Sequence, residues 1–85
     1  MTATRPRRIS VIGAGSCDAA TAAQARRLGA LLAARGFEIV CGGGGGVMEA
    51  VCRGAREAGG RTIGILPGND RDAANPHVEV AIATG

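Results

Sequence analysis

Five consecutive glycines at positions 42–46 are the part of this sequence best suited to hold a ligand. An apolar segment at 37–41 leads into them, and an amphipathic segment at 47–52 follows. A strand that passes through glycines into a helix is typical of phosphate-binding loops, because a helix N-terminus offers unpaired N–H groups and about half a positive charge. Glycine also lets an anion approach the backbone closely.

The glycine run therefore predicts a site for a phosphate or a nucleotide. The residues expected to bind the ligand are Gly42, Gly43, Gly44, Gly45, Gly46, Val47 and Met48. The run is not a Walker loop, because no Gly-Lys-Ser or Gly-Lys-Thr follows it and the chain contains no lysine.

A second turn, at 13–18, matches half of the dinucleotide fingerprint G-x-G-x-x-G, with Asp18 at the position of the third glycine. A standard NAD or FAD site also needs an acidic residue at the end of the second strand, where this chain has Cys41. That class of site is therefore disfavoured. The turn is either a tight connection or a second phosphate contact, made by Gly13, Gly15 and Ser16.

The other reactive side chains are scattered. His77 has no partner at motif spacing and is expected at the surface, and Asp70 and Asp72 are expected in a solvated turn. Cys17 and Cys41 are expected to be small core residues near the ends of adjacent strands, with a role as soft ligands left open. The three cysteines lack C-x-x-C spacing, which argues against a disulfide or structural zinc. We therefore assign no catalytic residue and no metal site.

Hydrophobic periodicity places these motifs on a β-α-β-α-β-β chain. Strands are expected at 9–13, 37–41, 62–66 and 78–82, and helices at 18–35 and about 46–58. The first helix is expected to begin either at Asp18, as the cap, or one turn later with a capping box made by Thr21 and Gln24. Gly36 is expected to end it, and Gly59 with Gly60 to stop the second helix. The inner face of the second helix is expected to carry Met48, Val51, Cys52 and Ala55.

This order predicts an α/β, Rossmann-like half-domain with a mainly parallel sheet at 9–85, preceded by a flexible basic tail at 1–8. With strands in the order 3-2-1, both helices cover one face, and the other, lined by residues such as Val11 and Ile39, stays bare. Parallel sheets are normally covered on both faces. We therefore expect the first half of a larger domain, or a truncated chain that needs a partner, and a homo-oligomer.

The amino-acid composition limits the classes of partner that this chain is expected to bind. The 85 residues form at most one domain and contain no apolar run of about 18 residues or apolar signal core, so we expect a cytoplasmic protein that does not enter the membrane. The net charge is +3, but Phe37 is the only aromatic residue. Nucleic acid is not expected to be a partner, because base stacking needs aromatic side chains.

Three segments, 40–50, 54–60 and 64–67, resemble the LOG-like Rossmann-fold family, and more closely its bacterial branch related to molybdenum-cofactor carrier proteins. The residues at 75–78 and 83–85 also fit that branch, so the resemblance runs from Ile9 to Gly85. It implies a Rossmann-like fold and binding of a phosphorylated ligand, a nucleoside monophosphate or a molybdopterin-type cofactor, through the stretch from Gly42 to Met48.

The resemblance does not extend to catalysis. Enzymes of the LOG family cleave the N-glycosidic bond of nucleoside 5′-monophosphates with a second motif, P-G-G-x-G-T-x-x-E, whose glutamate is catalytic. The segment 66–69, Leu-Pro-Gly-Asn, is not that motif, and no other part of this chain carries it. Binding of a small phosphorylated ligand is thus the leading hypothesis. The alternatives are the N-terminal half of a phosphoribohydrolase and a non-catalytic oligomerisation fragment.

Overall fold

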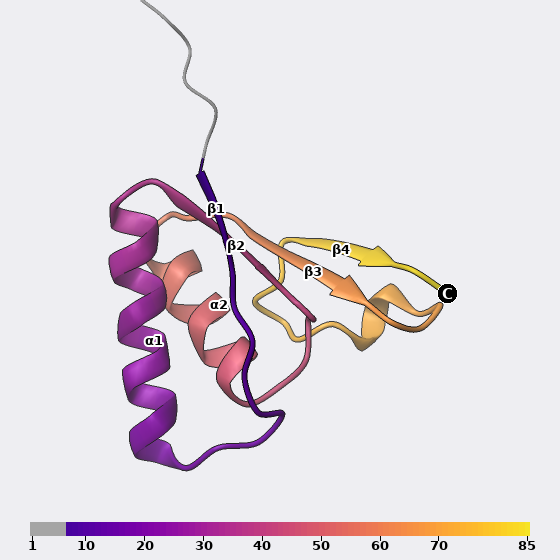
Figure 1. The fold of residues 1–85 in the computed structure, drawn as a ribbon, viewed down its shortest axis with the longest axis horizontal. Helices are drawn as coiled ribbons and strands as arrows, with labels where there is room; N and C mark the ends of the chain where they lie inside the picture. Colours follow the sequence, from indigo (N-terminus) through magenta and orange to yellow (C-terminus); the bar gives the residue numbers. More distant parts are fainter. Residues whose placement is uncertain (1–6) are drawn as a thin grey trace, which may run out of the picture.

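Four parallel strands form a sheet, and two helices pack against one of its faces, in the computed structural model, which describes residues 7–85 (Figure 1). The elements follow one another as β1 (Arg7–Ser10), α1 (Ala19–Ala34), β2 (Phe37–Cys41), α2 (Val47–Glu57), β3 (Thr62–Leu66), the 3-10 helix η1 (Arg71–Ala73) and β4 (Val80–Ala83). The strands lie in the order β1-β2-β3-β4, and every neighbouring pair is parallel. This confirms the predicted α/β class, the element order and the edge position of the fourth strand.

The helix ends agree with the capping residues read from the sequence. Asp18 is the N-cap of α1, and its Oδ1 accepts a hydrogen bond from the Thr21 N–H at 2.8 Å. Gly36 follows α1 with φ 83°, and Gly59 follows α2 with φ 81°. Both are left-handed positions that favour glycine after a helix.

The first strand begins and ends earlier than the sequence indicated. It covers Arg7 to Ser10 rather than 9–13, so Arg7 and Arg8 belong to the sheet and not to a flexible tail. The rest of the expected tail, 1–6, lies outside the described residues. Val11 still donates to the Val40 oxygen at 2.8 Å, but at Ile12, which is 95% exposed, the chain has left the sheet to reach α1. The fourth strand is also shifted, to Val80–Ala83.

The core lies between the sheet and the helices. Ile39 is completely buried there, together with Val51 and Cys52 of α2, and Val11 packs against the same cluster. The expectation that Val11 and Ile39 line the bare face is therefore wrong. Successive strand residues point to opposite faces, so an error of one residue in the phase of the alternation exchanges the faces.

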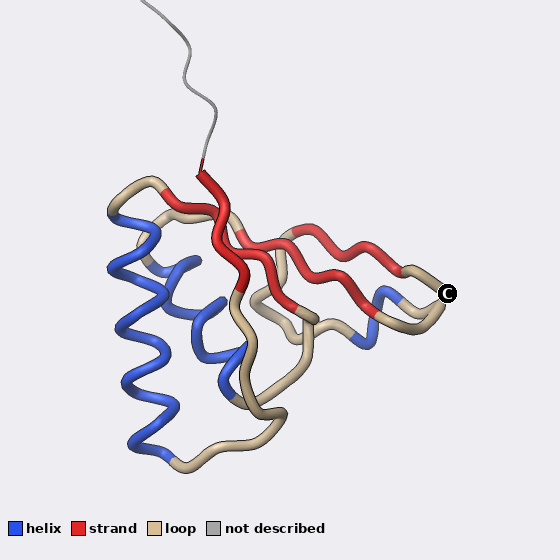
Figure 2. Tube along the Cα trace, viewed as in Figure 1, coloured by secondary structure: helices blue, strands red, loops and turns tan. Residues whose placement is uncertain are grey.

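Within residues 7–85, neither long helix covers the opposite side of the sheet, because α1 and α2 lie on the same side of the strands (Figure 2). The strand register aligns the apolar residues that alternate with the core positions. We call this surface the uncovered face; its residues are Val40, Ile63, Ile65, Val80 and Ile82. Ile65 is 45% exposed and Ile82 is 46% exposed.

The two helices touch through their backbones. A Cβ on Gly29 of α1 would overlap the Val51 carbonyl of α2, and a Cβ on Gly54 of α2 would overlap the Arg26 carbonyl of α1. Glycine at both positions therefore allows the two helices to cross closely. Among the residues that the structure describes, no helix is both long and apolar enough to cross a membrane.

Candidate functional site

Two loops meet at the carboxyl end of the sheet. The first loop, 11–18, joins β1 to α1, and the glycine loop, 42–46, joins β2 to α2 (Figure 1). The Val47 N–H donates to the Ala14 oxygen at 3.1 Å, and a Cβ on Gly45 would lie 3.4 Å from the Gly15 oxygen. The structure thus places the sequence-predicted residues of the two turns next to each other, at the edge of a parallel sheet where α/β proteins bind ligands.

The glycine loop keeps several backbone donors free. Within residues 7–85, the N–H groups of Gly44, Gly45 and Gly46 donate no hydrogen bond, whereas the Gly43 N–H donates to Cys41 Sγ at 3.3 Å. Gly46 is the N-cap of α2 and supplies no side-chain cap. The N–H groups of the first turn have no acceptor inside a helix, so Met48 adds a further donor beside the loop.

The two helix N-termini differ in whether a side chain caps them by accepting a hydrogen bond. At α1, the Asp18 carboxylate accepts from the Thr21 N–H, and this bond lowers the pKa of Asp18. At α2, no side chain does the same. A bound anion would accept hydrogen bonds from the free N–H groups at the N-terminus of α2, as the Asp18 carboxylate does at α1.

The glycines of the loop differ in how well the fold would tolerate a side chain at each position. Gly43 and Gly46 have φ values of 77° and 62°, which other residues rarely adopt, and a Cβ on Gly46 would overlap the first loop. Gly44 has no such restriction, and its Cβ would meet only the flexible end of Met48. A side chain at Gly44 can therefore obstruct the free donors at the expense of only a shift in the end of Met48.

Asn75 fixes the shape of the glycine loop, and the sequence reasoning did not place it in the site. It is 7% exposed, its N–H donates to the Gly43 oxygen at 2.8 Å, and its Nδ2 donates to the Gly44 oxygen at 2.8 Å. Its Oδ1 accepts from the His77 N–H at 3.0 Å. The available signal was the Asn-Pro dipeptide at 75–76, which predicts a turn but not the loop that the turn contacts.

Cys41 lies beneath the same loop, buried as expected, but its neighbour is Cys52 of α2 rather than Cys17. Cys17 is half-buried, outside the core. His77 and the two aspartates do not reach the loops by any hydrogen bond of their side chains. Asp70 instead caps η1 by accepting from the Asp72 N–H at 2.8 Å, as expected of a solvated turn.

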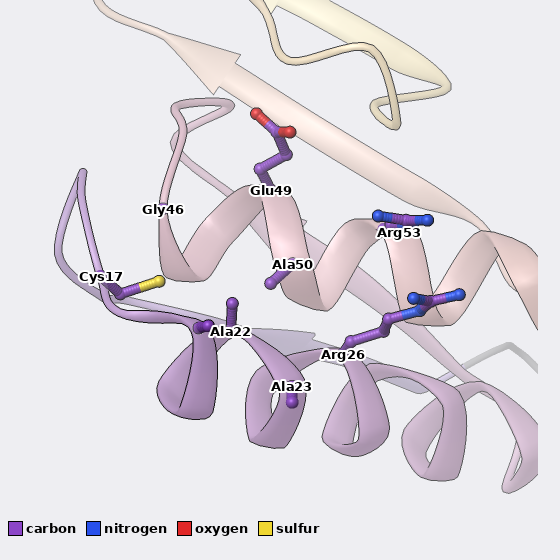
Figure 3. A pocket seen from close by; sticks show the side chains of 9 residues that line it. Cys17, Ala22, Ala23, Arg26, Gly46, Glu49, Ala50 and Arg53 are labelled. Atoms are coloured by element: carbon purple, nitrogen blue, oxygen red, sulfur yellow. The ribbon is translucent and has the colours of Figure 1, made fainter.

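A cavity of about 450 Å³ opens between the N-terminal halves of α1 and α2 (Figure 3). Short side chains, among them Ala22 and Ala50, leave the space empty, and Arg26 and Arg53 stand at one end. Arg26 Nε donates to Glu57 Oε1 at 2.6 Å, so its charge is already balanced. The cavity shares Gly46 with the glycine loop and none of the other residues predicted to bind the ligand.

The family model described as the SLOG cluster4 family matches residues 6–85. A curated protein of Archaeoglobus fulgidus, described only as an uncharacterized protein, is 46% identical over 76 residues, which are 89% of this chain and 50% of that protein.

Solved structures of cofactor-binding proteins share the fold. The molybdenum cofactor binding protein of Rippkaea orientalis is 39% identical with a TM-score of 0.87, over 98% of this chain and 52% of that one. The Moco carrier protein of Chlamydomonas reinhardtii is 39% identical with a TM-score of 0.85, over 95% of this chain and 51% of that one. The chain spans about half the length of the relatives it matches.

Proposed function

This chain belongs to the SLOG cluster4 family, and on that premise we propose that it binds a small phosphorylated ligand through the glycine loop and the first loop. The observation that carries the proposal is the N-terminus of α2, which has no side-chain cap and stands beside three unused N–H groups, those of Gly44, Gly45 and Gly46. A phosphate can accept from several such donors at once, and the helix dipole favours its charge.

A molybdopterin-type cofactor is the ligand that we favour over a nucleoside monophosphate. The similar proteins of known structure include molybdenum cofactor carrier and binding proteins. The residues present fit the phosphate end of such a cofactor, because the backbone at Gly44 and Gly45 is open to an anion. When bound, the cofactor would supply its metal chemistry, and this chain would hold and orient the phosphate.

Glu49 gives the site a second chemical preference. It lies in the first turn of α2, and its Oε1 is 3.9 Å from the position of a Cβ on Gly45. No ion pair neutralises it within residues 7–85. A carboxylate here opposes a bare anion but can accept hydrogen bonds from ring N–H groups. We therefore expect ligands that join a phosphate to a nitrogen heterocycle, which describes both pterins and nucleotides.

The first experiment is a titration of the full chain followed by amide NMR, with AMP, molybdenum cofactor and inorganic phosphate as separate ligands. We expect the amide signals of Gly44, Gly45, Gly46 and Met48 to shift with AMP or the cofactor. The signals of Gly36 and Gly59, which follow the C-terminal ends of α1 and α2, should stay in place. Shifts confined to residues outside the two loops would refute the assignment of the site.

Self-association is a second proposed property, and the uncovered face favours it. Ile65 and Ile82 lie next to each other in the strand register and are both nearly half exposed. Apolar patches of this kind on parallel sheets are normally buried. We propose a homo-oligomer in which the uncovered faces of two copies meet.

A further inference from the structure

Two buried thiols lie side by side beneath the glycine loop. Cys41 Sγ, at the end of β2, is 3.6 Å from Cys52 Sγ, in the second turn of α2. Cys41 is 6% exposed and Cys52 is completely buried. The binding mechanism proposed above uses neither sulfur. The positions are 11 residues apart, and no spacing motif in the sequence links them.

The surroundings give the two sulfurs different roles. Cys41 Sγ accepts from the Gly43 N–H at 3.3 Å as well as lying against Cys52. The hydrogen bond from the Cys52 thiol, together with that from Gly43, lowers the pKa of Cys41. The same contact with Cys41, followed by burial, raises the pKa of Cys52. Cys41 is thus the thiol that loses its proton more readily, and it belongs to the slightly more exposed residue, so Cys52 is the partner that reacts second.

We propose that Cys41 and Cys52 are a redox modification site that closes to a disulfide when the protein meets hydrogen peroxide. The Cys41 sulfur attacks one peroxide oxygen, the O–O bond breaks, and one water leaves as Cys41 becomes a sulfenic acid. The Cys52 sulfur then loses its proton and attacks Cys41, the S–O bond breaks, and a second water leaves. Two thiols are oxidised by two electrons, and one peroxide is reduced to two waters.

The consequence for the glycine loop follows from the distances. A disulfide requires the two sulfurs to approach from the present 3.6 Å to about 2.05 Å, so the Cys41 sulfur, the Cys52 sulfur or both must move. The movement displaces the acceptor of the Gly43 N–H and shifts the neighbouring free donors. The loop spans the two cysteines and contains five glycines, which is the flexible composition that permits such closure. This step rests on the proposed function, since it predicts weaker ligand binding in the oxidised state.

The test maps the disulfide in the wild-type protein. Trypsin releases a peptide covering 36–53 that holds both cysteines, while Cys17 lies in another peptide. After graded peroxide and alkylation with iodoacetamide, we expect the 36–53 peptide to be two hydrogens lighter and unlabelled. Cleavage after Glu49 should leave its two pieces joined until dithiothreitol is added. A Cys17→Ser variant should give the same result.

Two outcomes would overturn the proposal: a sulfinic acid at Cys41 with Cys52 still alkylated, or oxidation of Cys17 while the 36–53 peptide remains fully alkylated. A second measurement follows AMP affinity of reduced and oxidised protein by calorimetry, with a severalfold loss expected on oxidation. Equal affinities would refute the coupling to the loop. If the reduced protein binds no AMP and no molybdenum cofactor, the proposed function fails, and the peptide map still decides the disulfide.

Discussion

The side chain of Asn75 donates from Nδ2 to the carbonyl oxygen of Gly44 at 2.8 Å, across 31 positions of the chain. Through this bond, the segment that leads to β4 holds the loop between β2 and α2. A loop of five glycines has little intrinsic preference for one shape. We infer that the free N–H groups of the loop keep their orientation because Asn75 fixes the carbonyls on either side.

The Asn75→Ala variant should therefore be less stable and have a looser loop. Removing the side-chain donor leaves the Gly44 carbonyl oxygen without its partner, at a cost of about 1–3 kcal/mol, while the backbone N–H of residue 75 still donates to the Gly43 oxygen. Urea unfolding should show this loss, and amide exchange at Gly44 and Gly45 should accelerate. The matched control is Asn69→Ala, an exposed asparagine whose side chain makes no hydrogen bond within residues 7–85. Equal stability of the two variants would contradict this role.

Glu49 is expected to limit the affinity for a simple anion. A charge at a helix N-terminus contributes roughly 0.3–1 kcal/mol, so Glu49→Gln should raise the affinity for inorganic phosphate about two- to fivefold. The same variant should bind AMP no more tightly than the wild type, because it also loses the acceptor proposed for the heterocycle. Calorimetry with both ligands measures the two effects. Asp72→Asn, which removes the same charge from an exposed turn, should change neither; a rise in phosphate affinity there would show a general charge effect.

The sequence identified those features that depend on local chemistry. Asp18, Gly36 and the glycine run lie where capping and turn preferences place them, and α2 follows from the spacing of Val51, Cys52 and Ala55. The bounds of β1, and which residues of each strand point toward the helices, were harder to predict, because the sequence of a short apolar strand is compatible with either orientation. The solved relatives and the family match confirm the LOG-like fold and the similarity to molybdenum-cofactor carriers.

The sequence could not predict contacts between residues that are far apart in the chain. Asn75 meets Gly44, and Cys41 meets Cys52, only because β3 and α2 pack against β2, and no local pattern encodes those distances. The binding role of Gly13, Gly15, Ser16 and the glycine loop stays a prediction.

The cap on α1 gives a prediction for acid stability. Hydrogen bonding to Thr21 lowers the pKa of Asp18 below its ordinary value of 3.8, so the folded state favours the carboxylate. The stabilisation is complete above that ordinary value and is lost as the pH falls through the lowered folded-state pKa. Asp18→Ala should lower the melting temperature at pH 7, and the difference from wild type should shrink toward pH 2. A difference that stays constant with pH would show that the carboxylate charge plays no part.

The uncovered face predicts self-association at micromolar concentration. Ile65→Lys places a charge within the proposed contact and should convert oligomers to monomers in light scattering. Leu31→Lys is the matched control, since Leu31 is 49% exposed on α1, outside that face. The control should leave the assembly unchanged. A monomeric wild-type protein that does not bind ANS would contradict the proposed contact.

The most direct test of the central claim is the affinity of Gly44→Val for AMP and for molybdenum cofactor, measured by isothermal titration. Valine at this position crowds the free donors while its Cβ meets only the flexible end of Met48. Gly68→Val is the control, because a Cβ there meets nothing within 4 Å. Loss of charge-assisted hydrogen bonds should weaken binding about tenfold or more in Gly44→Val, with Gly68→Val like the wild type. Equal affinities of all three proteins would remove the glycine loop from the binding site.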